Sequence, residues 1–307
     1  MLKLRACLLS GCLLNIFNPV VLAVPISPTP ATAQKVALTT FIGTIPVRQE
    51  LASLKAEMQT LISKYPSLSP GLLVMDVETG DYVNIGSDRV FAAASTIKLP
   101  ILLAFFEAVD AGKIDLNEML TVERKSISSG SGTLQYSVGK ELTALETATK
   151  MIVVSDNTAT NMIIDRVGGI EFINSRFKSW GLQNTYLRNL LGDFKGTNKT
   201  TPADLVRVAA MIAKHKIISD KSRADALDIL NATENRKLLA AGLGAGAHIA
   251  HKTGDIGFVI GDAGIVEKPN GKLYLISVFV VRPYNDINAR YLVQELSRSA
   301  YNYLLQQ

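Results

Sequence analysis

The sequence predicts a mixed α+β protein, in which an antiparallel sheet of about five strands is flanked by helices from the two ends of the chain. Three observations lead to this prediction. An amphipathic helix and two strand-like runs come first, helical periodicity then dominates residues 95–215, and three strand-like runs precede a last amphipathic helix. This order favours a sheet completed by both ends of the chain, with an all-helical domain inserted between them.

The first helix is expected within residues 48–65, where apolar side chains recur at helical spacing. These side chains are Leu51, Leu54, Met58, Leu61 and Ile62. Residues 71–86 then read as two strands joined by a turn at Thr79 and Gly80. The N-terminal part of the chain therefore supplies one helix and two strands.

Helical patterns follow, with typical segments at residues 99–112, 143–154 and 201–215. Thr201 is expected to cap the last of these helices, because its hydroxyl can accept from a free backbone N–H and Pro202 suits the first turn. The middle of the chain is therefore expected to be helical throughout.

The C-terminal part returns to strands, which are followed by one helix. Strand-like runs occupy residues 248–254, 257–268 and 272–281, and the last two are joined by a turn at 269–271 of sequence Pro-Asn-Gly. An amphipathic helix is expected over residues 287–305. With these three strands, the predicted sheet has about five strands.

An export signal is expected at the N-terminus, because Lys3 and Arg5 precede a largely apolar stretch over residues 6–24. Small residues allow cleavage after Ala23 or Ala33, and "LSGC" ending at Cys12 resembles the lipobox of bacterial lipoproteins, which leaves lipid anchoring as an alternative. The predicted organisation is an export signal at 1–33, a linker at 34–47, an α/β domain at 48–98 and 218–307, and a helical domain at 99–217. The active site is expected in the cleft between the two domains.

Composition and charge argue against several classes of function. The net charge of +5 falls to +3 once Lys3 and Arg5 are removed, and the chain has neither a basic run nor a nucleic-acid motif, so no nucleic-acid partner is expected. Its three histidines, at 215, 248 and 251, include no pair at metal-ligand spacing that is backed by carboxylates, so neither a metal nor a cofactor is predicted. Both cysteines lie within the export signal, which leaves no thiol for catalysis in the folded part.

A Ser-x-x-Lys pattern at Ser95 and Lys98 is the first candidate for chemistry. A serine hydroxyl is a weak nucleophile at neutral pH, and a lysine one helical turn later can act as its base if its pKa is lowered. The same spacing recurs at 137–140 and 175–178, so the pattern has little meaning alone. Two further motifs distinguish Ser95: "SDN", beginning at Ser155, and "KTG", beginning at Lys252, each occur once and in this order.

Together these motifs resemble those of the class A β-lactamases and the small penicillin-binding proteins of the same fold, over roughly residues 48–305. Ser155 follows Ser95 by 60 residues, which also matches this family. The resemblance implies the serine β-lactamase/D,D-peptidase fold. It also implies that Ser95 is the acylated nucleophile, that Lys98 is its base, and that Ser155, hydrogen-bonded to Lys252, relays a proton to the leaving nitrogen.

The resemblance implies substrate-binding roles for four further residues. Asn157 would orient Lys98 and the substrate amide, Thr253 would contact the substrate carboxylate, and Gly254 completes the motif. The backbone N–H groups of Ser95 and Asp255 would form the oxyanion hole. Asp255 departs from the pattern, since the β-lactamases usually have a small residue there, and its side chain would add negative charge at the rim. Arg282 and Arg290 are candidates for the family's carboxylate-binding arginine.

The pattern also departs at the residue that releases the acyl group. Class A β-lactamases use a glutamate to activate the deacylating water, and its position falls at Leu191 when the alignment is anchored on Gly181. Asp193 is the nearby carboxylate that could substitute, although a turn role is expected for it. The loop before Thr200 is also about six residues shorter than usual, so the alignment could shift.

These features favour a penicillin-binding D-Ala-D-Ala peptidase, of the carboxypeptidase type, that is acylated by β-lactams at Ser95 and releases them slowly. The alternative is a class A-like β-lactamase that uses Asp193 or another route to activate water. A β-lactam receptor and a non-catalytic binding module are the remaining hypotheses. The expected partners are β-lactams and D-Ala-D-Ala peptides of peptidoglycan. We expect an exported, periplasmic or cell-envelope protein that would contact the membrane only through its N-terminal segment.

Overall fold

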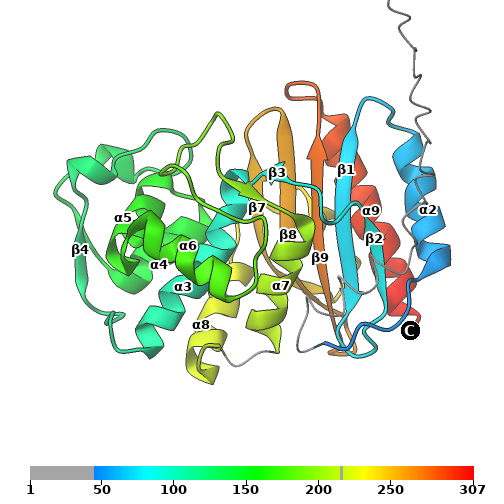
Figure 1. The fold of residues 1–307 in the computed structure, drawn as a ribbon, viewed down its shortest axis with the longest axis horizontal. Coiled ribbons are helices and arrows are strands. Elements are labelled where there is room, and N and C mark those ends of the chain that lie inside the picture. The colour runs from blue at the N-terminus through cyan, green and yellow to red at the C-terminus, as the bar shows by residue number, and fades with distance from the viewer. Residues whose placement is uncertain (1–44, 215–216) are drawn as a thin grey trace, which may run out of the picture.

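The computed structural model describes residues 45–214 and 217–307, and it confirms the predicted α+β fold class. The predicted export signal, the predicted cleavage and lipidation sites, both cysteines and His215 lie outside the described residues. Five antiparallel strands form the main sheet in the order β2-β1-β9-β8-β7 (Figure 1). Their bounds are β1 Ser69–Asp76, β2 Tyr82–Ile85, β7 His248–Asp255, β8 Val259–Glu267 and β9 Leu273–Val281.

The first and last strands of the chain are neighbours in this sheet. β1 pairs along its whole length with β9, from Ser69 opposite Val281 to Asp76 opposite Tyr274. The predicted turn between β8 and β9 is present, and Gly271 adopts φ +77° there, a conformation that suits glycine. The N-terminal strands are thereby joined directly to the hairpins of the C-terminal part.

Helices cover both faces of the sheet (Figure 1). α2 (Ala52–Ser63) and α9 (Asn288–Leu305) pack on one face over an apolar cluster that includes Met58 and Leu292. α7 (Pro202–Ala213) contacts β1, β8 and β9 on the other face, and it begins as predicted, because Thr201 Oγ1 accepts from the Asp204 N–H at 3.0 Å. The sheet is therefore buried between two helical layers.

The remaining helices form the helical part beside the sheet, around a central α3 whose side chains are almost all buried. Their bounds are α3 Lys98–Asp110, α4 Ala144–Val153, α5 Asn157–Val167, α6 Gly169–Ser179 and α8 Asp220–Asn231. α8 was not among the predicted helices, and it is capped by Ser219, whose hydroxyl accepts from the Ser222 N–H at 3.1 Å. α3 contacts α4, α5, α6, α7 and α8, so it anchors this part to the sheet.

Two short strand pairs complete the fold. β3 (Phe91–Ala92) pairs with β6 (Lys199–Thr200), and β4 (Met119–Thr121) pairs with β5 (Glu141–Thr143). β3 leads directly into the 3₁₀ helix η1 (Ala94–Ile97), which continues into α3. Among the described residues, no helix combines the length and apolar character needed to cross a membrane.

Candidate active site

Ser95 lies in η1, at the junction between the sheet and α3. Ala94 has a positive φ of 47°, and this backbone turn directs the chain from β3 into the helix. Lys98 is the first residue of α3 and follows Ser95 by one turn, so the Ser-x-x-Lys spacing places both side chains on one side of the helix start. Lys98 is fully buried, whereas Ser95 is partly exposed and lines a cavity.

The Lys98 amine is held by the "SDN" segment. Lys98 Nζ donates to the backbone oxygen of Ser155 at 2.6 Å and to Asn157 Oδ1 at 2.8 Å, and it lies 3.1 Å from Ser155 Oγ. Burial and the nearby positive charge of Lys252 lower the pKa of Lys98 well below its usual range, although Asp156 partly opposes this shift. The site therefore favours the neutral amine, the form that can accept a proton.

The "SDN" residues link α4 to α5, and the local sequence explains their placement. Asp156 caps α5 by accepting from the Ala159 N–H at 2.9 Å, and it also accepts from the N–H groups of Thr133 and Leu134 at 2.7 and 3.0 Å. Ser155 adopts φ +58°, which is uncommon for a residue with a side chain. The bond from Lys98 Nζ to the Ser155 carbonyl oxygen and the bonds made by the neighbouring Asp156 hold Ser155 in this conformation.

Strand β7 supplies the opposite wall of the site. Lys252 is almost fully buried, and burial lowers its pKa to about 8, although the charge of Asp262 partly opposes this shift. The structure records a bond of 2.8 Å from Lys252 Nζ to the Thr253 carbonyl oxygen, and none to Ser155 among the described residues, which differs from the contact implied by resemblance. Lys252 and Thr253 both line the cavity.

Gly254 allows β7 to approach the nucleophile closely. A Cβ atom at this position would lie 2.8 Å from the Ser95 backbone nitrogen and 2.9 Å from that of Thr96. Any larger residue would push the strand away from η1. The glycine of "KTG" therefore brings the end of β7, and with it Asp255, next to the backbone of Ser95.

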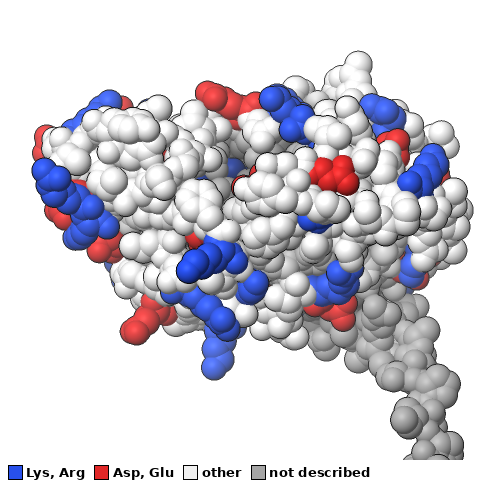
Figure 2. Space-filling model, turned by 90° about the horizontal axis from the view of Figure 1, so that it is seen from above, with Lys and Arg blue, Asp and Glu red and all other residues white. Residues whose placement is uncertain are grey.

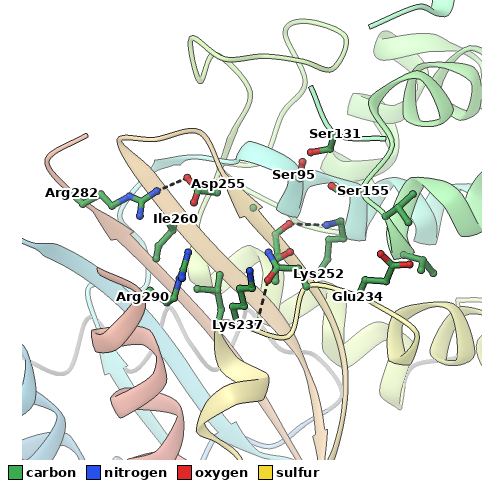
Figure 3. A pocket seen from close by; sticks show the side chains of 16 residues that line it. Ser95, Ser131, Ser155, Glu234, Lys237, Lys252, Asp255, Ile260, Arg282 and Arg290 are labelled. Carbon is green, nitrogen blue, oxygen red and sulfur yellow. Dashed lines mark hydrogen bonds and ion pairs between the residues drawn. The ribbon is translucent and has the colours of Figure 1, made fainter. Parts of the chain in front are cut away.

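These residues surround one cavity of about 440 Å³ (Figure 3). The predicted residues that line it are Ser95, Ser155, Lys252, Thr253, Gly254 and Asp255. Lys98 and Asn157 are bonded to each other behind this surface. Four other polar residues line the cavity, and no motif in the sequence predicts them, because only the tertiary structure brings them there: Ser131, Glu234, Asn235 and Lys237.

The two candidate arginines have different environments. Arg290, from the first turn of α9, lines the cavity, and no ion pair is recorded for it among the described residues (Figure 3). Arg282 also borders the cavity, but its guanidinium is paired with Asp255. Viewed from above the strand ends, the charged side chains lie in small separate groups of both signs (Figure 2).

The loop expected to carry the deacylating base is present, but neither candidate residue in it lines the cavity. Leu191 is buried, and Asn161 accepts from its N–H at 2.9 Å and donates to its carbonyl oxygen at 2.7 Å. Asp193 accepts from Thr197 Oγ1 at 2.8 Å and from the Asn198 N–H at 2.7 Å. Both oxygens of Asp193 are therefore used within the loop, which agrees with the expected turn role.

The fold and this arrangement of Ser95 beside two buried lysines are those of a serine hydrolase. Residues 53–304 match the family model described as the beta-lactamase enzyme family. The chain belongs to this family, as its motifs had indicated.

Comparisons with individual proteins agree with this family. The structure of a protein described as PBP-A matches with a TM-score of 0.84 and 48% identity, covering 86% of this chain and all of that chain. A leucine-to-glutamate mutant of PBP-A, described as an acyl-enzyme complex with penicillin G, matches with a TM-score of 0.83 and 47% identity over 86% of this chain and 100% of that chain. An ancestral class A β-lactamase has a TM-score of 0.75 and 26% identity, covering 81% of this chain and 99% of that chain.

Curated relatives are β-lactamases with lower identity. Beta-lactamase ROB-1 of Haemophilus influenzae is 30% identical over 182 residues, which is 58% of this chain and only about half, 53%, of the relative. A β-lactamase of Bacteroides uniformis is 23% identical over 285 residues, covering 86% of this chain and 96% of the relative. Both relatives carry the name of the family whose model matches residues 53–304.

Proposed function

We propose that this protein is a penicillin-binding D-Ala-D-Ala peptidase that is acylated at Ser95 and releases β-lactams slowly. The observation that supports this proposal is that, among the described residues, the loop around Leu191 presents no free carboxylate to the cavity. Its side chain is apolar and buried, and both oxygens of nearby Asp193 are bonded within the loop. A dedicated base for the deacylating water is thus lacking in this loop, whereas the residues needed for acylation are assembled.

Acylation follows from the placement of the polar groups. Ser95 Oγ attacks the carbonyl carbon of the substrate and passes its proton to the neutral amine of Lys98. The developing oxyanion accepts from the backbone N–H groups of Ser95 and Asp255, and the close approach of Gly254 to the Ser95 backbone supports this assignment. Ser155 donates its hydroxyl proton to the leaving nitrogen and is reprotonated from Lys98, 3.1 Å away.

The remaining lining groups fit a substrate with a free carboxylate. In our proposal Thr253 and the cation of Lys252 bind this group, and Arg290, for which no ion pair is recorded among the described residues, lies nearby. Asn157 holds Lys98 with its amide oxygen at 2.8 Å and donates its amide nitrogen to the Ser129 carbonyl at 2.9 Å, so its orientation is fixed. This combination suits a peptide that ends in D-alanine.

The two substrate classes would leave the acyl-enzyme in different states. When a peptide reacts, the D-alanine departs and opens space for water or an amine. In a β-lactam adduct the leaving group stays tethered, so deacylation depends more strongly on an activated water. Slow release of β-lactams with faster turnover of peptides is therefore expected. The similarity to PBP-A supports this proposal, and a penicillin adduct is described for that protein's leucine-to-glutamate mutant.

A class A-like β-lactamase is the second candidate, and the curated relatives favour it. It would require a water-activating group other than a loop glutamate, and the bonds made by Asp193 count against that residue. A receptor or a non-catalytic module is less well supported, because both lysines and both serines of the acylation site are present. We further propose that the protein is exported to the cell envelope, on the basis of the predicted signal at residues 1–33.

One experiment separates these functions. The mature protein is incubated with a chromogenic β-lactam and with a D-Ala-D-Ala peptide, while intact mass and free D-alanine are followed over time. The proposal predicts a persistent adduct on Ser95 and release of D-alanine, and Ser95→Ala is the control that should form no adduct. Sustained β-lactam turnover would instead identify a β-lactamase, and a lack of adduct together with a lack of turnover would refute every acyl-enzyme mechanism.

A further inference from the structure

Asp255 places a carboxylate on the same residue whose N–H is proposed to complete the oxyanion hole. Its side chain is 49% exposed and borders the cavity next to Ser95 (Figure 3). Asp255 Oδ1 accepts from the Gly257 N–H at 2.9 Å and from Arg282 Nη2 at 2.5 Å. The carboxylate is therefore held at the rim of the site by one backbone bond and one ion pair.

Arg282 is held by more contacts than this ion pair alone. Its side chain is only 4% exposed, Nε donates to the Gly257 carbonyl oxygen at 2.8 Å, and Nη1 donates to the Asp286 carbonyl oxygen at 3.2 Å. Its backbone N–H donates to the carbonyl oxygen of Phe258 at 2.9 Å. A guanidinium fixed by protein acceptors in this way is suited to holding the turn between β7 and β8, and poorly placed to turn toward a substrate.

An unpaired charge on Asp255 would oppose the reaction twice. It would repel the negative charge that develops on the substrate oxygen beside the Asp255 N–H, and it would repel the carboxylate of the incoming substrate. Glu234 also lines the cavity, so a further uncompensated negative charge would weaken the attraction that the lining cations supply, which are Lys237, Lys252 and Arg290. A positive partner for Asp255 removes this penalty.

We propose that Arg282 is a positioning residue that neutralises Asp255 and thereby permits acylation by anionic substrates. Arg282 acts through Asp255 and not by binding the substrate. This inference rests on the proposed function, since it assigns the Asp255 N–H to the oxyanion hole. It applies equally to a peptidase and to a β-lactamase, because both need the acylation step.

A double-mutant cycle tests the inference. Acylation rates with penicillin are compared for wild type, Asp255→Asn, Arg282→Gln and the double variant. Arg282→Gln is expected to slow acylation by about tenfold or more, the size expected for an uncompensated charge near an oxyanion. Asp255→Asn in the Arg282→Gln background should recover most of this loss, because it removes the uncompensated charge. Asp255→Asn alone should raise the rate above that of wild type.

Two further measurements separate charge from a purely structural role. The loss in Arg282→Gln should shrink at high ionic strength, because Asp255 is half exposed and its charge is screened. Arg282→Lys keeps the positive charge and should acylate faster than Arg282→Gln. Thermal unfolding of each variant confirms that it is folded before its rate is compared.

The outcomes are distinct. An Arg282→Gln variant that acylates at the wild-type rate overturns the inference. A double variant that stays as slow as Arg282→Gln also overturns it, and would indicate that Arg282 binds substrate directly or acts only by shaping the turn. If wild type itself forms no adduct, the proposed function fails, and this result is recognised before any variant is compared.

Discussion

The side-chain amide of Asn161 pairs with both backbone groups of Leu191, accepting from its N–H at 2.9 Å and donating to its carbonyl oxygen at 2.7 Å. Asn174 makes the same paired contact with Leu187, at 2.8 Å in each direction. These two helix residues, from α5 and α6, fix the loop that borders the helical part. The position of Leu191 is thus fixed by hydrogen bonds to its backbone, and these bonds do not involve its side chain.

Removing the Asn161 amide should destabilise the protein. Asn161→Ala would leave the buried N–H and carbonyl oxygen of Leu191 without these partners, and we expect the free energy of unfolding to fall by about 1–3 kcal/mol. Urea denaturation measures this change. Asn189→Ala is the matched control, because the Asn189 side chain is bonded to Thr197 at the surface, and its effect should be within about 0.5 kcal/mol. Equal effects of the two substitutions would contradict the prediction.

A carboxylate at position 191 should accelerate release of the acyl group. Leu191→Glu would supply a general base for water, a contribution of roughly 10²–10⁴-fold when the base is well placed, and we expect at least about tenfold here. The decay of the penicillin adduct, followed by intact mass, measures the rate. Leu191→Gln has the same shape without the charge and should not accelerate release. Unchanged decay in a folded Leu191→Glu protein would mean that the glutamate's position lies elsewhere in the loop.

Asp193→Asn tests whether Asp193 has a hidden catalytic role. Both oxygens of Asp193 accept bonds within the loop, and an amide oxygen can keep one of them, so a modest loss of stability is expected. Deacylation should be no slower than in wild type. A decrease of about tenfold or more in a folded variant would favour the β-lactamase alternative, in which Asp193 activates water.

Lys98 should be essential for acylation, unlike the lysines of the other Ser-x-x-Lys patterns. Lys98→Ala removes the base beside Ser95 and should slow adduct formation by about 10²-fold or more. Lys178→Ala is the matched control, because Lys178 is an exposed residue of α6 three positions after Ser175. Wild-type acylation by Lys98→Ala would exclude the lysine as the base.

The pH dependence of acylation should report the two buried lysines. Lys98 must be neutral to accept a proton, and burial together with the charge of Lys252 lowers its pKa well below the usual range, which increases the fraction of neutral amine. Lys252 must stay charged to bind the carboxylate, and its pKa is about 8, so the rate should fall as the pH rises above about 8. Lys252→Arg keeps its charge at higher pH and should move this decline upward. Rates measured with penicillin from pH 6 to pH 10 give the profile, and the same decline in both proteins would contradict the assignment.

Much of the fold could be predicted because its strands and helices have clear patterns. The strands at residues 248–281 and the helix that ends the chain are strongly apolar or amphipathic, and the structure confirms them. α8 was missed because its sequence is mostly polar, although Ser219 and the following Asp220 are a typical helix start. Its contact with α3, in which Asp110 accepts from the hydroxyls of Ser219 and Ser222 at 2.7 Å, depends on the tertiary structure.

The motif residues could likewise be predicted, but their partners could not. Ser95, Ser155 and Lys252 stand in motifs whose order is informative. Glu234 and Lys237 lie in a polar stretch without any pattern, and they reach the cavity only through the packing of the segment before β7. The pairing of Asp255 with Arg282 joins the ends of two strands 27 residues apart, and no sequence period reports such a contact.

Because β9 lies between β1 and β8, the active site can form only when the whole sheet has assembled. Ser95 follows the strands of the N-terminal part, whereas Lys252 and Gly254 belong to β7, which is joined to those strands only through β9 and therefore only after β9 has been synthesised. A chain that ends before β9 would carry all three motifs and lack the sheet that brings them together. Covalent labelling by a fluorescent penicillin would then count fully assembled molecules, and could serve as a folding assay in cells as well as an activity assay.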